Sequence, residues 1–466
     1  MSDLDLIVKG GTVVTASDSY LADIGIKDGR IALIGQDLTS AAEVIDAAGL
    51  LVLPGGIDSH VHISQPSGDG VTMADDFESA TRSAAFGGVT TVIPFCLQEK
   101  GQTLREAVDW YHGISKGECH IDYGFHLIIT DPTPQALGQD LPALVADGYS
   151  SVKVFMTYEG MKLTDREILE TLEAAKACGA LPMVHAENDD AIEFLRDRAE
   201  DRGDTAPKFH AYTRPIPAER EATHRAISLA EIIDTPVVIV HVSNRDAMEE
   251  IRAGRARGTK VYGETCPQYL VLTAEDLDTA GFDGAKYVCS PPPRDTASQA
   301  ACWEGLETDV FDIFSTDHCP FRFDDAEGKK HPKGLKTFRW VPNGIPGVET
   351  GLRILFSEGV AKGRISLQRF VALTSTNHAK LYGLYPRKGT IAIGADADLA
   401  LWDPDRRETI AQQNLHHGAD YTPFEGIEVQ GAPVRTLVRG RTVVKNGALT
   451  GEKGHGAFQR RGLSAL

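Results

Sequence analysis

Eight short apolar or β-branched runs alternate with stretches of helical character along the middle of the chain. Such alternation is typical of parallel strands joined by crossover helices, and eight strands are the number that closes a (β/α)8 barrel. The runs are 50–58, 88–95, 121–129, 151–156, 181–186, 237–242, 260–264 and 311–316. We therefore predict an α/β fold built on a TIM-like barrel, with its active site at the carboxyl ends of the strands.

Residues with metal-binding side chains lie in or directly after several of these runs. Successive side chains of a strand alternate between its two faces, so both histidines of a His-x-His sequence can reach one metal ion. A His-x-His pair by itself also fits two buried histidines that bond to the backbone, but regular placement at one end of the barrel favours a two-metal hydrolytic site. The candidate ligands are His60, His62, Lys153, His185, His241 and Asp317.

The length of 466 residues exceeds what one hydrophobic core usually supports, so a second unit is expected beside the barrel. Short strands separated by Gly and Asp turns are predicted near both ends, at 6–14, 23–27, 30–35, 397–402, 434–439 and 441–444. The predicted domains are residues 1–54 and 386–466, which together form a small β-sandwich, and residues 55–385, which form the barrel. The Gly- and Arg-rich segment 451–466 lacks periodicity and is predicted to be disordered or to lie over a neighbouring subunit.

Composition narrows the range of partners and locations. The net charge of -19 argues against binding to nucleic acid or to an anionic membrane. Seven cysteines, without a Cys-x-x-Cys pair, indicate reduced thiols rather than a disulfide framework. The amino terminus does not resemble a signal peptide, and no apolar stretch approaches membrane-spanning length. We therefore expect a cytoplasmic protein.

Several longer motifs narrow the prediction further. Together they closely resemble the cyclic amidohydrolases, specifically dihydropyrimidinase and the bacterial hydantoinases, and the resemblance covers nearly the whole chain. The motifs are His60-Val61-His62, Lys153-Val154-Phe155-Met156, His185-Ala186-Glu187-Asn188, Tyr262 to Gln268, Ser290-Pro291-Pro292, Ser315 to Phe321, Asn343 to Glu349, Asn377 to Lys380 and Gly394 to Asp398.

The resemblance implies a role for each candidate residue. It implies that His60, His62 and Asp317 hold the more buried metal ion, that His185 and His241 hold the more exposed one, and that a carboxylated Lys153 bridges two divalent ions, usually Zn²⁺. Tyr158 would donate to the developing oxyanion, and backbone groups of Ser290 and Asn343 would bind the substrate ring. The implied reaction is hydrolysis of a cyclic amide bond in dihydropyrimidines or 5-substituted hydantoins, which yields N-carbamoyl amino acids. The implied assembly is a homotetramer.

Physical arguments support the implied chemistry. Two divalent ions lower the pKa of a bridging water, and Asp317 is placed to act as general base and then general acid. Burial lowers the pKa of a lysine, and a neutral amine can add carbon dioxide to give a carbamate. The alternatives are a surface lysine for Lys153, a helix N-cap for Asp317 and an ordinary interfacial tyrosine for Tyr158.

Other residues near these motifs have simpler interpretations. His318 is expected to point away from the ligands, and Cys319 to be an inert buried thiol. His210 and Arg214 lie in the family-like segment 209–215, for which the sequence indicates no role.

Rival activities differ in short motifs. Dihydroorotases of similar sequence carry arginine two residues after His-x-His, where this chain has Ser64. An allantoinase-like enzyme or another cyclic ureide or imide hydrolase remains an alternative. A non-catalytic scaffold homologue is a remote alternative, because such proteins have lost metal ligands whereas this chain retains all six candidates. The loop 63–70 is polar and glycine-rich, which predicts a preference for small or polar ring substituents, unless other loops shape the pocket.

Overall fold

Eight parallel strands form a nearly closed barrel in the computed structural model, which describes residues 4–68 and 70–466. The strands follow the order β6 (Gly56–Val61), β7 (Val89–Leu97), β9 (His126–Ile128), β10 (Ser151–Phe155), β11 (Leu181–His185), β12 (Val237–Ile239), β13 (Val261–Thr265) and β14 (Ile313–Phe314), and the short β8 (Asp122–Tyr123) also pairs with β7. The backbone N–H of His62 donates to the carbonyl of His318 at 2.7 Å, which brings the first and last strands together. The predicted barrel is confirmed.

The first apolar run contains two strands rather than one. Residues Leu51–Pro54 form β5, which belongs to the sheet of the chain termini, whereas β6 begins at Gly56 in the barrel. Gly55 separates them, and a Cβ atom at this position would lie 2.1 Å from the Thr90 hydroxyl oxygen. Because only glycine fits against Thr90, this residue allows the chain to pass from one sheet into the other.

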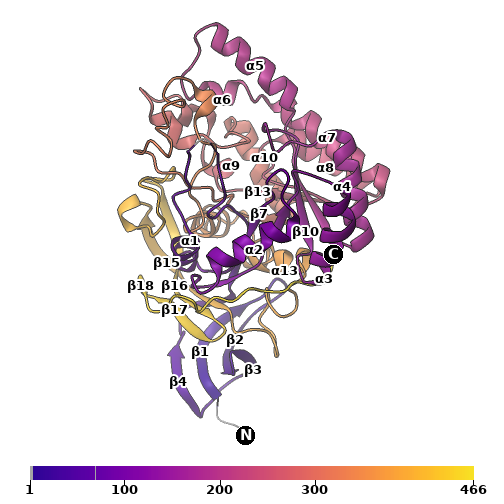
Figure 1. Cartoon of the computed structure of the whole chain (residues 1–466). Helices are drawn as coiled ribbons and strands as arrows, with labels where there is room; N and C mark the ends of the chain where they lie inside the picture. The colour runs from indigo at the N-terminus through magenta and orange to yellow at the C-terminus, as the bar shows by residue number, and fades with distance from the viewer. Residues whose placement is uncertain (1–3, 69) are drawn as a thin grey trace.

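Many of the helices lie around the outside of the barrel (Figure 1). The α-helices of the described residues are α1 (Phe77–Phe86), α2 (Leu104–Ser115), α3 (Leu141–Ala146), α4 (Asp165–Cys178), α5 (Asp189–Asp201), α6 (Phe209–Tyr212), α7 (Ile216–Ile233), α8 (Arg245–Ala256), α9 (Gln268–Val271), α10 (Thr296–Glu307), α11 (Gly351–Leu355), α12 (Leu367–Val371) and α13 (Asn377–Leu381). None of the helices within the described residues is long and apolar enough to cross a membrane.

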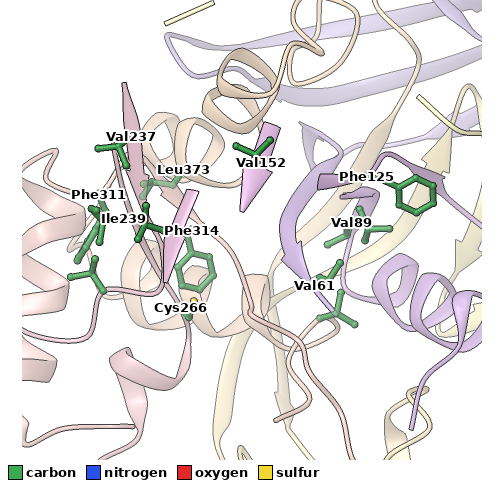
Figure 2. Close-up of a cluster of buried hydrophobic side chains, with 14 of the residues drawn as sticks. Val61, Val89, Phe125, Val152, Val237, Ile239, Cys266, Phe311, Phe314 and Leu373 are labelled. Carbon is green, nitrogen blue, oxygen red and sulfur yellow. The ribbon is translucent and has the colours of Figure 1, made fainter. Parts of the chain in front are cut away.

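Strand periodicity separates two hydrophobic layers. In β10, Val152 and Val154 belong to the large core between strands and helices, part of which Figure 2 shows. Phe155 belongs to a second cluster, to which β7, β11 and β12 also contribute. Lys153 lies on the same face of β10 as Phe155, because side chains two residues apart share a face. The strand thus turns a lysine away from its outer hydrophobic layer.

The two ends of the chain build one nine-stranded sheet beside the barrel (Figure 1). Its strands are β1 (Leu4–Val14), β2 (Ser19–Lys27), β3 (Arg30–Gly35), β4 (Ala41–Asp46), β5, β15 (Leu399–Thr409), β16 (Glu428–Val438), β17 (Arg441–Lys445) and β18 (Ala448–Leu449). Most neighbours are antiparallel, but β1 pairs in parallel with both β4 and β5. The predicted β-structure built from both chain termini is confirmed, and β4 and β18 are strands that the sequence pattern did not reveal.

The C-terminal segment packs on the barrel of its own chain, so the prediction of a disordered tail or one lying over a neighbour was wrong. The Phe458 ring lies 5.7 Å from Phe125 and 5.2 Å from Tyr149. Arg461 is buried and donates to the Ser151 hydroxyl at 2.9 Å. One aromatic ring and one buried guanidinium anchor a segment whose composition alone indicated no order.

A buried lysine joins the barrel to the terminal unit. The Lys388 ammonium lies 2.7 Å from the Asp122 carboxylate of β8 and 3.3 Å from Asp396, and it also contacts Asp398. Arg439 forms a further ion pair with Asp122. These three aspartates have a spacing that would suit a metal ion, but the Lys388 ammonium already supplies the positive charge that they require.

Replacing Lys388 with methionine is expected to destabilise the protein by about 3–5 kcal/mol, because buried carboxylates would lose the ammonium that compensates them. Chemical denaturation would measure the change. Lys362→Met is the matched control, since Lys362 forms an exposed helical pair with Glu358 and its loss should cost about 0.5 kcal/mol or less. Equal stability of the two variants would contradict a role for Lys388 in joining the units.

Candidate active site

The carboxyl ends of the barrel strands open into a cavity of about 640 Å³. All nine residues that the sequence indicated as site residues contribute to its wall. They are His60, His62, Lys153, Tyr158, His185, His241, Ser290, Asp317 and Asn343. Parallel strands bring their carboxyl ends to one side of a barrel, which explains how residues so distant in sequence meet here.

His60, His62 and Asp317 converge on one point. The Oδ1 atom of Asp317 lies 3.2 Å from Nε2 of each histidine, and the three donor atoms lie within 4.8 Å of one another. Burial alone would raise the pKa of the Asp317 carboxyl, but contacts with His60 and His62 outweigh it and hold the pKa below its usual value. A carboxylate with two imidazoles is a donor set that divalent transition metals favour.

A second pair of histidines lies beside this set. The ring centroids of His60 and His241 are 5.4 Å apart, and His241 Nε2 lies 2.8 Å from Nδ1 of His185. Burial lowers the pKa of both His185 and His241, which favours the neutral, metal-binding form of each ring. His241 has a φ of 41°, and this left-handed backbone turns its side chain away from the outer layer where Ile239 packs.

Lys153 is fully buried near both groups of ligands. Its Nζ atom has no hydrogen-bond partner among the described residues and lies 5.1 Å from the ring centroids of Phe95 and Phe155. Burial lowers the pKa of this amine to about 8, although the carboxylates of Glu264 and Asp317 favour its charged form. The exposed lysine considered as an alternative is therefore excluded, and a fraction of this amine is neutral near neutral pH.

Carboxylate and amide groups behind the histidines orient the rings, and the sequence analysis did not single them out. Glu264 Oε1 lies 2.6 Å from His60 Nδ1, and Gln65 Oε1 lies 2.8 Å from His62 Nδ1. Each contact leaves Nε2 of its histidine free to face the cavity. Glu264 belongs to the motif 262–268, but its distance of 204 positions from His60 hides the contact from sequence reasoning.

Tyr158, Ser290 and Asn343 lie on loops along the cavity wall. Tyr158 has a φ of 77°, a strained conformation that its Asp189 contact supports, because Asp189 Oδ1 accepts from the Tyr158 backbone N–H at 3.2 Å. Burial raises the pKa of the Tyr158 phenol, so it stays a protonated donor at neutral pH. The side-chain oxygen of Asn343 is buried without a partner among the described residues, which leaves it available to a ligand.

Comparison with known proteins decides the family. The sequence profile of the amidohydrolase family matches residues 51–443. The chain is 48% identical to the D-hydantoinase of Geobacillus stearothermophilus and 45% identical to that of Rhizobium radiobacter, with 98% of this chain and 96% and 99% of those proteins covered. The chain belongs to the amidohydrolase family.

A solved structure shows which members of the amidohydrolase family this chain resembles. The dihydropyrimidinase from Brevibacillus agri NCHU1002 superposes with a TM-score of 0.96 at 45% identity and covers 99% of each chain. The predicted relationship to the dihydropyrimidinases and hydantoinases is therefore confirmed. Because the likeness spans both the barrel and the terminal sheet, it concerns the whole architecture rather than the barrel alone.

The donor set of this amidohydrolase fits a pair of divalent ions. Two groups of neutral or anionic side chains lie side by side, and the buried Lys153 amine between Phe95 and Phe155 has no hydrogen-bond partner among residues 4–68 and 70–466. A buried amine without a partner is costly, and conversion to an anionic carbamate would give it metal ions to bind. These residues are therefore suited to the metal centre that the family implies.

The neighbours of Asp317 have structural roles in this amidohydrolase. His318 Nε2 lies 3.1 Å from the Asp75 carboxylate, and its Nδ1 accepts from the backbone N–H of Gly347 at 3.1 Å. Burial raises the pKa of the Cys319 thiol, which disfavours the reactive thiolate. The expectation that neither residue joins the ligands agrees with this geometry.

Proposed function

We propose that this protein hydrolyses the cyclic amide bond of dihydropyrimidines or 5-substituted hydantoins and releases N-carbamoyl amino acids. The observation that carries the proposal is that two ligand groups meet in one cavity with a buried lysine whose amine has no hydrogen-bond partner in the described part of the chain. An allantoinase-like activity on another cyclic ureide is the second candidate, since the same donor set would serve it. A non-catalytic scaffold would have no need for this donor set.

The proposed cofactor is a pair of divalent ions, with Zn²⁺ as the metal that best suits imidazole and carboxylate donors. His60, His62 and Asp317 would hold one ion, His185 and His241 the other, and carboxylated Lys153 would bridge them. Two such ions would supply a nucleophile near neutral pH by lowering the pKa of a water molecule between them.

Protein groups would transfer the protons, stabilise the developing negative charge and bind the substrate ring. Asp317, whose pKa is held low, is an acceptor for the proton of the attacking water and can return it to the departing ring nitrogen. The Tyr158 phenol would donate to the oxyanion that develops on the carbonyl oxygen. Backbone groups of Ser290 and Asn343 would bind the ring amides and thereby recognise the ureide independently of its substituent.

Replacing Tyr158 with phenylalanine is expected to lower kcat roughly 100-fold or more, because one donor to the transition state is lost. KM should change little, since the ring amides keep their backbone partners. Steady-state kinetics would measure both parameters. A variant with a raised KM and unchanged kcat would make Tyr158 a residue that only binds substrate.

A turnover panel tests the proposed function. Purified protein should hydrolyse dihydrouracil, dihydrothymine, hydantoin or 5-substituted hydantoins faster than allantoin or dihydroorotate. Elemental analysis of the same preparation should find about two divalent ions per chain. Preferred turnover of allantoin would favour the second candidate, whereas turnover by metal-free protein would exclude the proposed chemistry.

Substrate preference within this class depends on the loop 63–70, of which residue 69 lies outside the described residues. Gln65 and Ser67 line the cavity, but the Gln65 side-chain oxygen is already bound to His62. Met161, Phe321 and Trp340 line the same cavity with apolar surface from other loops. We retain the preference for small or polar substituents as a proposal, and kcat/KM for 5-phenylhydantoin against dihydrouracil would test it.

A cytoplasmic location and a homotetrameric assembly complete the proposal. The tetramer follows from the resemblance of the sequence motifs to the hydantoinases, and the cysteines of the described residues, all of which are free thiols, support the location. Light scattering after size-exclusion chromatography would give the mass of the assembly. A monomer at micromolar concentration would contradict the tetramer.

A further inference from the structure

The segment 209–215 has two buried ionisable side chains that the proposed chemistry leaves without a role. His210 lies in α6 and Arg214 follows it, and both are buried. A fully buried guanidinium is costly unless it is paired and hydrogen-bonded, so its partners indicate why the fold retains it.

Arg214 reaches a candidate metal ligand through one carboxylate. Its Nη1 atom donates to Glu187 Oε2 at 2.6 Å, and the same oxygen lies 2.7 Å from Nε2 of His185. Because Nε2 of His185 is directed at Glu187, its Nδ1 atom is the one that faces His241, at 2.8 Å from Nε2 of that ring.

The same segment supports two residues on the substrate side of the cavity. The Arg214 guanidinium lies 5.4 Å from the ring centroid of Tyr158, and its Nε and Nη2 atoms lack hydrogen-bond partners among the described residues. His210 Nε2 lies 2.9 Å from the carbonyl oxygen of Cys289 and 3.1 Å from the Ser290 hydroxyl. Because a carbonyl oxygen can only accept, the Cys289 contact identifies Nε2 as the protonated nitrogen of His210. The segment 209–215 therefore contacts Tyr158 and Ser290 directly, and it reaches His185 through Glu187.

We propose that Arg214 is a positioning residue that acts through Glu187 on His185 and makes the His185/His241 metal site depend on segment 209–215. The proposal rests on the two-metal site of the proposed function. The His60/His62/Asp317 site does not share this dependence, because Glu264 and Gln65 orient its histidines. The two metal affinities should therefore respond to different substitutions.

Metal titration of the full-length protein tests this inference without any substrate. Arg214→Met should weaken one of two Zn²⁺ sites by about 10–100-fold and leave the other unchanged, which is the usual effect of losing a group that orients a ligand. Arg214→Lys, which can keep one hydrogen bond to Glu187, should recover part of the loss. Gln65→Leu is the matched control, since it removes the partner of His62 and should weaken the other site.

A double-mutant cycle separates a positioning role from a general structural one. If Arg214 acts through Glu187, the variant with both Arg214→Met and Glu187→Gln should lose no more affinity than the stronger single variant. Additive losses, or unchanged affinity of both sites in Arg214→Met, would overturn the inference while the proposed function stands. Wild-type protein that binds fewer than two ions would overturn both. Should Arg214→Met fail to fold, Arg214→Lys and Glu187→Gln decide by the same criteria.

Discussion

Replacing Lys153 with alanine is expected to abolish hydrolysis of every cyclic ureide. The proposed carbamate would join the two ligand groups, and without it the histidines would face two dications with too little negative charge. Metal content should fall together with activity. Kinetics with hydantoin or dihydrouracil and elemental analysis of the same sample would measure the two effects.

The Lys153→Ala variant is expected to fold, which keeps this experiment interpretable. It removes an amine for which the described residues provide no hydrogen-bond partner, so it relieves a cost of burial. A short carboxylic acid such as acetate or propionate should restore part of the activity by taking the place of the carbamate. Lys162→Ala is the control, because Lys162 lines the same cavity but already pairs with Asp189. Activity close to wild type in Lys153→Ala would remove Lys153 from the mechanism.

Replacing Asp317 with asparagine is expected to lower kcat by about 10³-fold or more, because proton transfer by a positioned side chain is lost together with a charged metal ligand. Asparagine matches the size of aspartate, so the effect would arise from charge rather than packing. Asp317 has a φ of 50°, and asparagine is among the residues that tolerate this conformation. Steady-state kinetics on metal-supplemented protein would separate the lost proton transfer from lost metal.

Glu193→Gln is the matched control for Asp317→Asn. Glu193 also lines the cavity, but it pairs with Arg196 and lies apart from the ligand groups. Its loss should change kcat by less than about tenfold. We take a larger loss of kcat as the sign of a catalytic role. Similar losses in the two variants would indicate that Asp317 only contributes charge to the cavity.

Local periodicity in the sequence was enough to predict the barrel and the placement of the candidate ligands at the ends of its strands. Alternation of side chains along β10 separates Lys153 from the valines that pack against the helices, and it places the two histidines of His60-Val61-His62 on one face. These features depend on neighbours within a few residues, so they can be read without knowledge of the fold. The terminal strands could be predicted for the same reason.

Only the tertiary structure decided how the ligands are oriented and how the chain closes. His241 follows Ile239 on a strand whose simple alternation would put both on the same face, and a left-handed backbone turns His241 into the cavity instead. The contacts of Glu264 with His60 and of Arg214 with Glu187 join positions 204 and 27 residues apart, and the C-terminal segment is anchored to its own barrel by Phe458 and Arg461. Such contacts depend on where segments distant in sequence meet after folding. Local residue patterns do not indicate which of these segments become neighbours.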